Sequence, residues 1–384
     1  MSSNWNVVPF TEAVDICDTL RKPINSSERA SRIKGKEQSE LYPYYGATGQ
    51  VGFIDDYITD GEYVLLGEDG APFLDAFSKK AYIISGKTWV NNHAHVLKSK
   101  TNNKFLCYYL NSFNYKGYVS GTTRLKLTQA EMKRIPVPVP PLSEQERIVA
   151  RIEELFSQLD AGVETLKKTK AQLAVYRQAV LKEAFAVCKE YVAIESVTQH
   201  VTDGDHMPPP KADNGIPFIM ISNIKGNAIS WGNTAFVGRD YYDSIEPKRK
   251  PQNGDVLYTV TGSYGIPVLV DFNKEFCFQR HIALLRPNDA IEQEYLYYSL
   301  MEPSVYAQAT EGATGTAQKT VGLGILRKIE IPFIENHSDQ LRIVEAIESR
   351  LSVCDSIEHT VDTALQQAEA MRQSILKDAF EGRL

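Results

Sequence analysis

The chain contains Ser143-Glu-Gln-Glu-Arg-Ile-Val-Ala-Arg-Ile-Glu153 and, 195 residues later, Ser338-Asp-Gln-Leu-Arg-Ile-Val-Glu-Ala-Ile-Glu348. Aligned without a gap over 43 residues, 143–185 against 338–380, the two copies share 17 identical positions. Repetition at a fixed offset indicates that one structural unit is used twice.

Each copy is predicted to form one long helix. Neither contains proline, and Ser143 offers an N-cap with Glu146 as its capping-box partner, whereas Ser338 is followed by Leu341 and lacks the second half of the box. The prolines at 136–141 precede the first copy. They are expected to form an extended approach that neither joins a strand ladder nor enters the helix.

Apolar residues recur along both copies with alternating spacings of three and four, which is typical of a coiled coil. At 1.5 Å per residue each helix would be roughly 64 Å long, and so narrow a stripe needs a partner. We expect the two helices to pair antiparallel and to relate the halves by an approximate twofold axis; the alternative is that each packs onto its own globule. The residues assigned to helix pairing or subunit docking are Ile148, Ile152, Leu155, Leu159, Leu166, Leu173, Ile343, Ile347, Ile357, Val361, Met371 and Ile375.

The predicted order is therefore globule, helix, globule, helix, with boundaries at 1–142, 143–185, 186–337 and 338–384. Short β-rich runs bounded by Gly, Asp or Asn predict mixed α/β (α+β) globules. The duplication continues into them more faintly. Gly121-Thr-Thr resembles Gly315-Thr-Ala, Gly61-Glu-Tyr-Val-Leu-Leu resembles Gly254-Asp-Val-Leu-Tyr-Thr, and Asn92-His-Ala-His resembles Arg280-His-Ile-Ala.

Charge and cysteine content limit the classes of protein. The 384 residues carry a net charge of −6, which by itself argues against nucleic-acid binding, yet residues 1–142 carry +3 while 186–337 carry −5. The five cysteines are scattered, which favours a reducing cytoplasm over a disulfide framework. No apolar run reaches the length of about 18 residues that a membrane span requires.

Two motifs resemble functional sites without supporting one. Ala81–Thr88 has the spacing of a phosphate-binding loop, but Tyr82-Ile-Ile is too bulky to wrap a phosphate. His93-x-His95 has no third ligand nearby, so a half-buried histidine on a strand is the better interpretation. We predict no catalytic residue, no metal site and no cofactor in this chain.

Loops that combine cations, hydroxyls and amides recur at matching places in both globules. Arginine can bridge guanine and glutamine can bridge adenine in the major groove, while threonine and lysine more often hold phosphates. Taken singly, each loop is better explained as a solvated surface; the recurrence at matching positions in both globules favours a function. The candidate DNA-binding residues are Arg32, Lys34, Lys36, Tyr44, Tyr45, Thr48, Gln50, Thr122, Thr123, Arg124, Lys126, His206, Ser222, Asn223, Lys225, Ser263, Tyr264, Thr316, Gln318 and Lys319.

The stretch from Pro140 to Asp160, the segment Arg177-Gln-Ala-Val-Leu-Lys-Glu-Ala-Phe185 and the ending Leu376-Lys-Asp-Ala-Phe-Glu-Gly-Arg-Leu384 resemble the DNA-specificity subunit of type I restriction-modification systems. The resemblance covers nearly the whole chain and is most specific in the helical segments. The second copy departs from the family pattern at Phe333-Ile-Glu-Asn-His337, where the family has a proline-rich lead-in.

The resemblance implies two target recognition domains, each reading one half of a split, asymmetric site on double-stranded DNA, with paired helices that set the spacing. It implies that the helices bind two modification subunits, which carry S-adenosylmethionine and methylate adenine N6. It further implies restriction subunits that use ATP and Mg. The alternatives are an independent methyltransferase, a coiled-coil scaffold without DNA specificity, and the specificity subunit of a related system outside type I.

Overall fold

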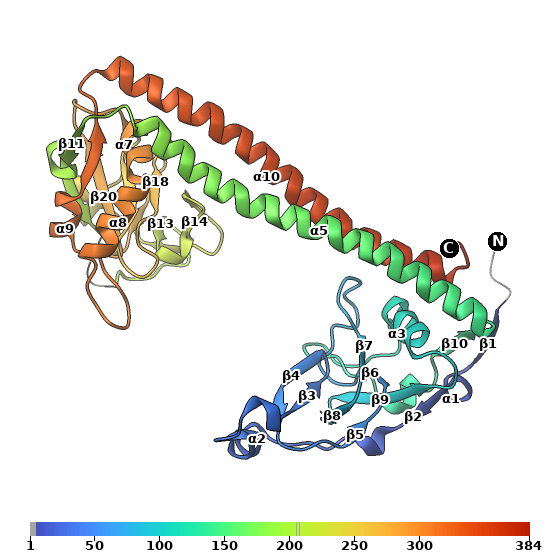
Figure 1. The fold of residues 1–384 in the computed structure, drawn as a ribbon. Coiled ribbons are helices and arrows are strands. Elements are labelled where there is room, and N and C mark those ends of the chain that lie inside the picture. Colours follow the sequence, from blue (N-terminus) through green and yellow to red (C-terminus); the bar gives the residue numbers. More distant parts are fainter. Residues whose placement is uncertain (1–4, 205, 207) are drawn as a thin grey trace. The chain divides into compact units, whose positions relative to one another are not determined.

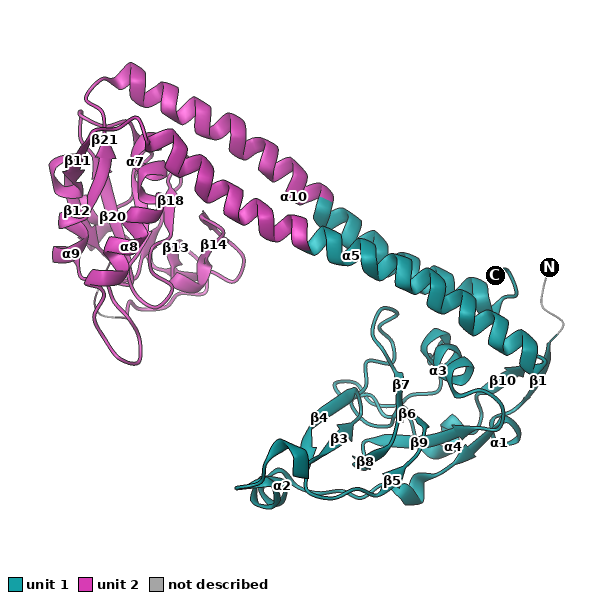
Figure 2. Cartoon of the chain, in the orientation of Figure 1, with its two compact units in different colours: residues 1–167, 361–384 teal, residues 168–360 magenta. Residues whose placement is uncertain are grey.

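The computed structural model describes residues 5–204, 206 and 208–384. It contains two compact units, which Figure 2 shows in different colours. Unit 1 comprises Met1–Lys167 and Val361–Leu384, and unit 2 comprises Lys168–Thr360. Each unit therefore consists of one globule together with parts of both long helices.

The two long helices are α5, Leu142–Phe185, and α10, His337–Phe380, each of 44 residues (Figure 1). Each begins one residue before the predicted start, so neither Ser143 nor Ser338 is the N-cap. The amide of Gln145 donates to the carbonyl of Pro141 at 3.0 Å in α5. In α10 the side chain of Asn336 accepts from the amide of Ser338 at 2.8 Å and so satisfies a first-turn donor.

Contacts within unit 2 show that the helices run antiparallel. Arg177 of α5 pairs with Asp355 of α10 at 2.6 Å, and six residues further along α5 Glu183 pairs with Arg350 at 2.8 Å. Apolar side chains from the same parts of both helices share one buried cluster, namely Val180, Leu181, Phe185, Ile343, Val344, Ile347 and Leu351. The predicted antiparallel pairing is confirmed.

Unit 1 repeats this arrangement at the other ends of the same helices. Ile148 and Ile152 of α5 share a buried cluster with Leu376 and Ala379 of α10. Arg372 forms an ion pair with Asp160. Arg147 also donates to the carbonyl of Leu384 at 2.8 Å, which holds the residues after α10 against the first turns of α5.

Two of the residues assigned to helix pairing or subunit docking lie outside the contact between the helices. Ile357 and Met371 are 40% and 55% exposed. The next residue in each case is half-buried instead: Glu358, which pairs with Arg177, follows Ile357, and Arg372 follows Met371. A helix with 3.6 residues per turn drifts about 20° per heptad from a strict 3.5-residue stripe, so the apolar stripe leaves the contact line. The other assigned residues are buried or half-buried: Ile148, Ile152, Leu155, Leu159, Leu166, Leu173, Ile343, Ile347, Val361 and Ile375.

The globule of unit 1 is built from two four-stranded sheets and one strand pair. The strand pair is β1 (Asn6–Pro9) with β10 (Pro136–Val139). The first sheet has the order β2 (Val14–Ile16), β9 (Ala94–Ser99), β6 (Tyr63–Gly67), β7 (Ala81–Ile84). The second has the order β4 (Gly49–Ile54), β3 (Tyr42–Gly46), β8 (Lys87–Val90), β5 (Thr59–Asp60). The helices are α1 (Phe10–Ala13), α2 (Ser26–Ile33), α3 (Asn103–Ser112) and α4 (Gln129–Met132).

The globule of unit 2 repeats this plan. Its strand pair is β11 (Glu190–Ala193) with β21 (Glu330–Phe333), and its four-stranded sheet has the order β12 (Thr198–Asp203), β20 (Ile282–Pro287), β17 (Val256–Thr259), β18 (Pro267–Leu269). A three-stranded sheet has the order β16 (Ala235–Val237), β13 (Ile216–Ile219), β19 (Cys277–Phe278), and β14 (Ile224–Lys225) pairs with β15 (Ala228–Ile229). The helices are α6 (Arg239–Ser244), α7 (Gln293–Leu300), α8 (Pro303–Gly312) and α9 (Leu323–Lys328).

The same topology in both globules extends the duplication beyond the helices. In each globule the strand before a long helix pairs antiparallel with the globule's first strand. The second sheet contains a parallel contact in both: Tyr44 lies opposite Trp89 in β3–β8, and Phe218 lies opposite Cys277 in β13–β19. The predicted mixed α/β class is confirmed.

The proline-rich approach to α5 is a strand, contrary to prediction. Residues Pro136–Val139 form β10 and pair with β1 in a two-stranded ladder. Because each strand of such a ladder has one free edge, a proline that lacks an N–H can face that edge at no cost.

Candidate nucleic-acid interface

In unit 1, residues 68–70 lie against residues 120–127, and we call these two segments the paired loop of unit 1. Ser120 and Lys126 exchange backbone hydrogen bonds of 3.0 and 2.8 Å. The amide of Gly70 donates to Leu125 at 2.9 Å, and the amide of Leu127 donates to Glu68 at 2.7 Å. These bonds fix the loop that carries the predicted residues Thr122, Thr123, Arg124 and Lys126.

Unit 2 contains the same structure in residues 260–262 and 314–321, the paired loop of unit 2. Thr314 and Thr320 exchange backbone hydrogen bonds of 2.9 and 2.8 Å. The amide of Gly262 donates to Lys319 at 2.9 Å, and the amide of Val321 donates to Val260 at 2.8 Å. The two units therefore present different side chains on one backbone framework.

Glycine begins the tight turn of each paired loop. Gly121 and Gly315 have φ values of +98° and +104°. A Cβ atom would lie 2.3 Å from the carbonyl oxygen of Arg124 at Gly121, and 2.4 Å from that of Gln318 at Gly315. Both the backbone conformation and the close approach require glycine.

A second glycine in each loop supports the candidate base-reading side chain. A Cβ on Gly70 would lie 3.2 Å from Nε of Arg124, and a Cβ on Gly262 would lie 2.8 Å from Nε2 of Gln318. The side chains of Arg124 and Gln318 thus lie against the backbone of equivalent glycines. Both side chains are exposed.

The two paired loops differ in charge. In unit 1 the Nε atom of Arg124 lies 2.8 Å from Asp69, and Nζ of Lys126 lies 3.6 Å from Glu68. In unit 2 the place of Asp69 is taken by Thr261, whose hydroxyl accepts a hydrogen bond from that of Thr320 at 3.3 Å. The first loop is a network of ion pairs and the second is neutral apart from Lys319.

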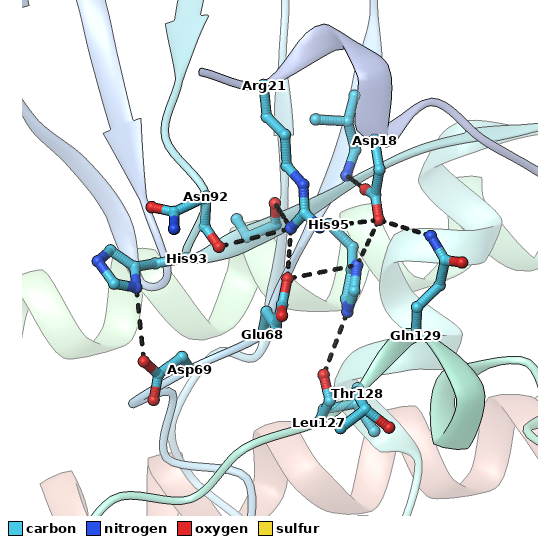
Figure 3. Close-up of polar contacts among 12 residues, drawn as sticks. Asp18, Arg21, Glu68, Asp69, Asn92, His93, His95, Leu127, Thr128 and Gln129 are labelled. Carbon is cyan, nitrogen blue, oxygen red and sulfur yellow. Dashed lines mark hydrogen bonds and ion pairs between the residues drawn. The ribbon is translucent and has the colours of Figure 1, made fainter. Parts of the chain in front are cut away.

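A buried histidine anchors the paired loop of unit 1 (Figure 3). His95 is fully buried; its Nδ1 lies 2.8 Å from Asp18 and its Nε2 lies 3.1 Å from the carbonyl of Leu127. Asp18 also accepts from the amide of Val96 and from Gln129. Burial opposes ionisation of Asp18, but its hydrogen bonds and the charge of His95 outweigh burial and lower its pKa.

The same contacts occupy the histidine pair that might have bound a metal. Both ring nitrogens of His95 are engaged, and His93 lies 3.6 Å from Asp69. Among the described residues, no group of three or more His, Cys, Asp or Glu side chains is arranged to hold a metal ion. The backbone of His93 has a structural role instead, because its carbonyl accepts from Glu68 as that of His281 accepts from Val260.

Two predicted DNA-binding residues belong to the interior. Tyr44 is only 4% exposed, with its hydroxyl bonded to the carbonyl of Ile24. Asn223 is also 4% exposed, and its side chain accepts from the amide of Met220 and donates to Ser230. These side chains hold their own loops together, and the prediction that they contact DNA is wrong.

Two predicted cations are engaged within the protein. Arg32 lies 2.6 Å from Asp55 and 5.1 Å from the centre of the Trp89 ring, and Lys36 lies 3.1 Å from Asp55. These contacts hold α2 and the residues after it against the β3–β4 sheet. A partner would have to compete with Asp55 for both cations.

Most other candidates lie at the surface. The turn between β3 and β4 lies close to the end of β6: a Cβ atom built on Gly67 would lie 3.1 Å from the carbonyl oxygen of Ala47. Tyr45 is half-buried against Tyr82, and Tyr264 is half-buried in a stack on Tyr306 with ring centres 5.7 Å apart. His206 is exposed and lies 2.9 Å from Asp203. The remaining exposed candidates are Lys34, Thr48, Gln50, Thr122, Thr123, Lys126, Ser222, Lys225, Ser263, Thr316 and Lys319.

Glu68, Asp69 and Gly70 were not among the predicted site residues. Val64 lies opposite Leu97 in unit 1, and Val256 lies opposite Leu285 in unit 2, so Val64 and Val256 are equivalent. The sequence alignment that matched Gly61 with Gly254 is therefore shifted by one residue along this strand. The correct register aligns Gly70 with Gly262. The equivalent histidines His93 and His281 are the sequence signal from which this alignment could have been found.

A chain with two copies of one α/β globule, two long antiparallel helices and one polar loop repeated in both copies has the architecture of a two-site recognition protein. The family model described as "Type I restriction modification DNA specificity domain" matches residues 3–174 and 203–367. The chain therefore belongs to the family of type I restriction-modification specificity subunits. Its role is that of a targeting subunit rather than an enzyme.

Named relatives and solved structures agree with this family. A Haemophilus influenzae protein named "Putative type I restriction enzyme specificity subunit" is 28% identical over 94% of this chain and 91% of its own length. The EcoKI specificity subunit of Escherichia coli is 24% identical over 73% of this chain and 65% of its own.

The fold matches a chain from a structure of type I restriction-modification complex assembly, with a TM-score of 0.72, 18% identity and coverage of 100% and 99%. It also matches the HsdS subunit of Thermoanaerobacter tengcongensis, with a TM-score of 0.52, 17% identity and coverage of 100% and 98%. Within the described residues, no helix is both long and apolar enough to cross a membrane.

Proposed function

We propose that each unit binds one half of a split, asymmetric site on double-stranded DNA, and that its paired loop makes the principal contact. The observation that carries this proposal is the recurrence of one backbone framework with different exposed side chains. If the loops had only a structural role, nothing would require the ion pair of Arg124 and Asp69 in unit 1 to be replaced by Gln318 and Thr261 in unit 2. Two half-sites of different sequence do need that change.

The long helices are proposed to dock two modification subunits, which bind S-adenosylmethionine and methylate adenine N6, while this chain holds no cofactor. Restriction subunits using ATP and Mg complete the proposed complex. Exposed apolar side chains on the helices support docking, because large apolar groups on an exposed helix face mark contact surfaces. In unit 2 they are Val175, Tyr176, Leu341, Val353 and Ile357.

The site of action is proposed to be the cytoplasm, where these partners and DNA meet. The five cysteines are all free, as a reducing compartment maintains them.

Binding to DNA with and without modification subunits tests this function. The chain is acidic overall, so we expect weak, salt-sensitive binding by the chain alone and tight, sequence-specific binding by the complex. A reconstituted complex that shows no preference for any DNA sequence would instead support a coiled-coil scaffold. Methyl transfer by the purified chain alone would identify an independent enzyme.

A further inference from the structure

We propose that Arg124 reads a guanine in the half-site of unit 1 and that Gln318 reads an adenine at the equivalent place in the half-site of unit 2. This inference rests on the proposed function and adds the identity of one base in each half-site. It also assigns Gly70 and Gly262 as positioning residues, because each provides the bare backbone over which the reading side chain lies.

Arg124 has the geometry of an oriented reader. Asp69 engages its Nε at 2.8 Å, and the side chain remains 60% exposed. Among the described residues, the guanidinium of Arg124 makes this ion pair but no hydrogen bond, so its donors are available to the N7 and O6 acceptors of guanine.

The carboxylate restricts the rotamers of a long side chain before binding, so less conformational entropy is lost when a base is contacted. Lys126, whose Nζ lies 3.6 Å from Glu68, carries a compact point charge suited to phosphate, whereas the planar fork of Arg124 suits a specific base contact.

Gln318 occupies the equivalent position without an acidic neighbour. Its amide passes over Gly262, and the positions of Glu68 and Asp69 are taken by Val260 and Thr261. A glutamine amide presents one donor and one acceptor, the pattern that adenine offers as N7 and N6–H₂. Thr316 and Lys319 lie near it in the loop, as Thr122 and Thr123 lie near Arg124, and these side chains are suited to phosphates.

The test is to sequence the methylated adenines produced by the assembled methyltransferase on a library of DNA sequences. Complexes carry the wild-type chain, Arg124→Gln or Gln318→Ala. Arg134→Gln and Gln252→Ala are matched controls, since Arg134 is an exposed arginine paired with Glu131 and Gln252 is an exposed glutamine, both outside the paired loops. Arg124 and Gln318 are also exposed, so these variants are expected to fold.

For Arg124→Gln we expect the preference for guanine at one position of one half-site to fall by roughly 5- to 150-fold. For Gln318→Ala we expect a comparable loss of preference for adenine in the other half-site, and unchanged motifs for both controls. An unchanged motif in the variants overturns the inference. Equal weakening at all sequences also overturns it, because it identifies a phosphate contact. A wild-type complex without any two-part motif would instead refute the proposed function.

Discussion

Asp18 Oδ2 lies 2.8 Å from Nδ1 of His95, and the other ring nitrogen of His95 reaches the carbonyl of Leu127 at the end of the paired loop of unit 1. A buried histidine of β9 and a half-buried aspartate of η1 thus hold a surface loop in place; the 3₁₀ helix η1 spans Asp18–Leu20. The strand register places Ala283 at the position of His95 in unit 2, so this histidine anchor has no counterpart at that position.

Removing the charge of Asp18 is expected to destabilise unit 1 in a pH-dependent manner. Because the pKa of Asp18 in the folded chain is below its ordinary value of 3.8, its ionised form contributes stability above that value, and the contribution is lost as the pH falls through the folded pKa. We expect Asp18→Asn to lower the free energy of unfolding by about 2 kcal/mol at pH 7 and by less below about pH 4. Urea titrations at both pH values measure this difference.

The matched control is Asp15→Asn, because Asp15 is an exposed carboxylate three residues away that lies 3.9 Å from Lys100. It should change the free energy of unfolding little at either pH. An Asp18→Asn deficit of equal size at pH 7 and pH 3.5 would contradict the assigned role of the carboxylate.

Gly70→Ala is expected to alter DNA recognition beyond its effect on stability. The new Cβ meets Arg124 Nε at 3.2 Å in a backbone with φ of +80°, so the arginine must move. Gly86→Ala is the control, since Gly86 has φ of +72° in the same unit and nothing within 4 Å of the added Cβ. Both should lose about 1–2 kcal/mol of stability from backbone strain. Only Gly70→Ala should weaken DNA binding by the assembled complex; equal affinities for the two variants would count against the paired loop.

Gln340→Leu is expected to destabilise unit 2 strongly. Gln340 is fully buried, donates to the carbonyls of Ala290 and Ile334, and accepts from the amide of Glu292. Leucine would leave these backbone groups buried and unpaired, at a cost of about 3 kcal/mol. Thermal or urea unfolding measures the loss. The exposed Gln367 on the same helix gives the control Gln367→Leu, and similar stability for both variants would refute this role.

Arg177→Ala is expected to weaken the pairing of α5 and α10 in a salt-dependent manner. Arg177 contacts Asp355 and Glu358 on the opposite helix at 2.6 and 2.9 Å. Because Asp355 is largely exposed and Glu358 is partly exposed, the loss should be about 1 kcal/mol at low salt and smaller at 0.5 M salt. Arg151→Ala removes only a local pair with Glu154 within α5 and serves as the control. An identical loss at both salt concentrations would rule out the ionic mechanism.

The helices and their pairing follow from local sequence, because a repeat at constant offset and a heptad stripe are both visible without tertiary contacts. The failures at Ile357 and Met371 are geometric, since a straight helix departs from a strict heptad. Strand β10 was missed for a different reason: Pro136 is compatible with a strand only at a free edge, and only the partner β1 shows that such an edge exists.

The site was predicted in part. Arg124 and Gln318 were identified because they recur beside Gly121 and Gly315 in the repeat. Tyr44 and Asn223 were misassigned because polar and aromatic side chains look alike in sequence whether they cap a loop or face solvent. Their burial depends on residues such as Ile24 and Ser230, which local pattern does not connect to them.

Each unit is proposed to read its own half-site on DNA. The most direct measurement is adenine-methylation sequencing of cells that express the modification subunit with this chain or with a chimera. In the chimera, residues 186–337 are exchanged for those of a related specificity subunit. We predict a two-part motif in which the exchange changes one half and leaves the other half unchanged. A motif that changes in both halves, or in neither, would contradict the claim.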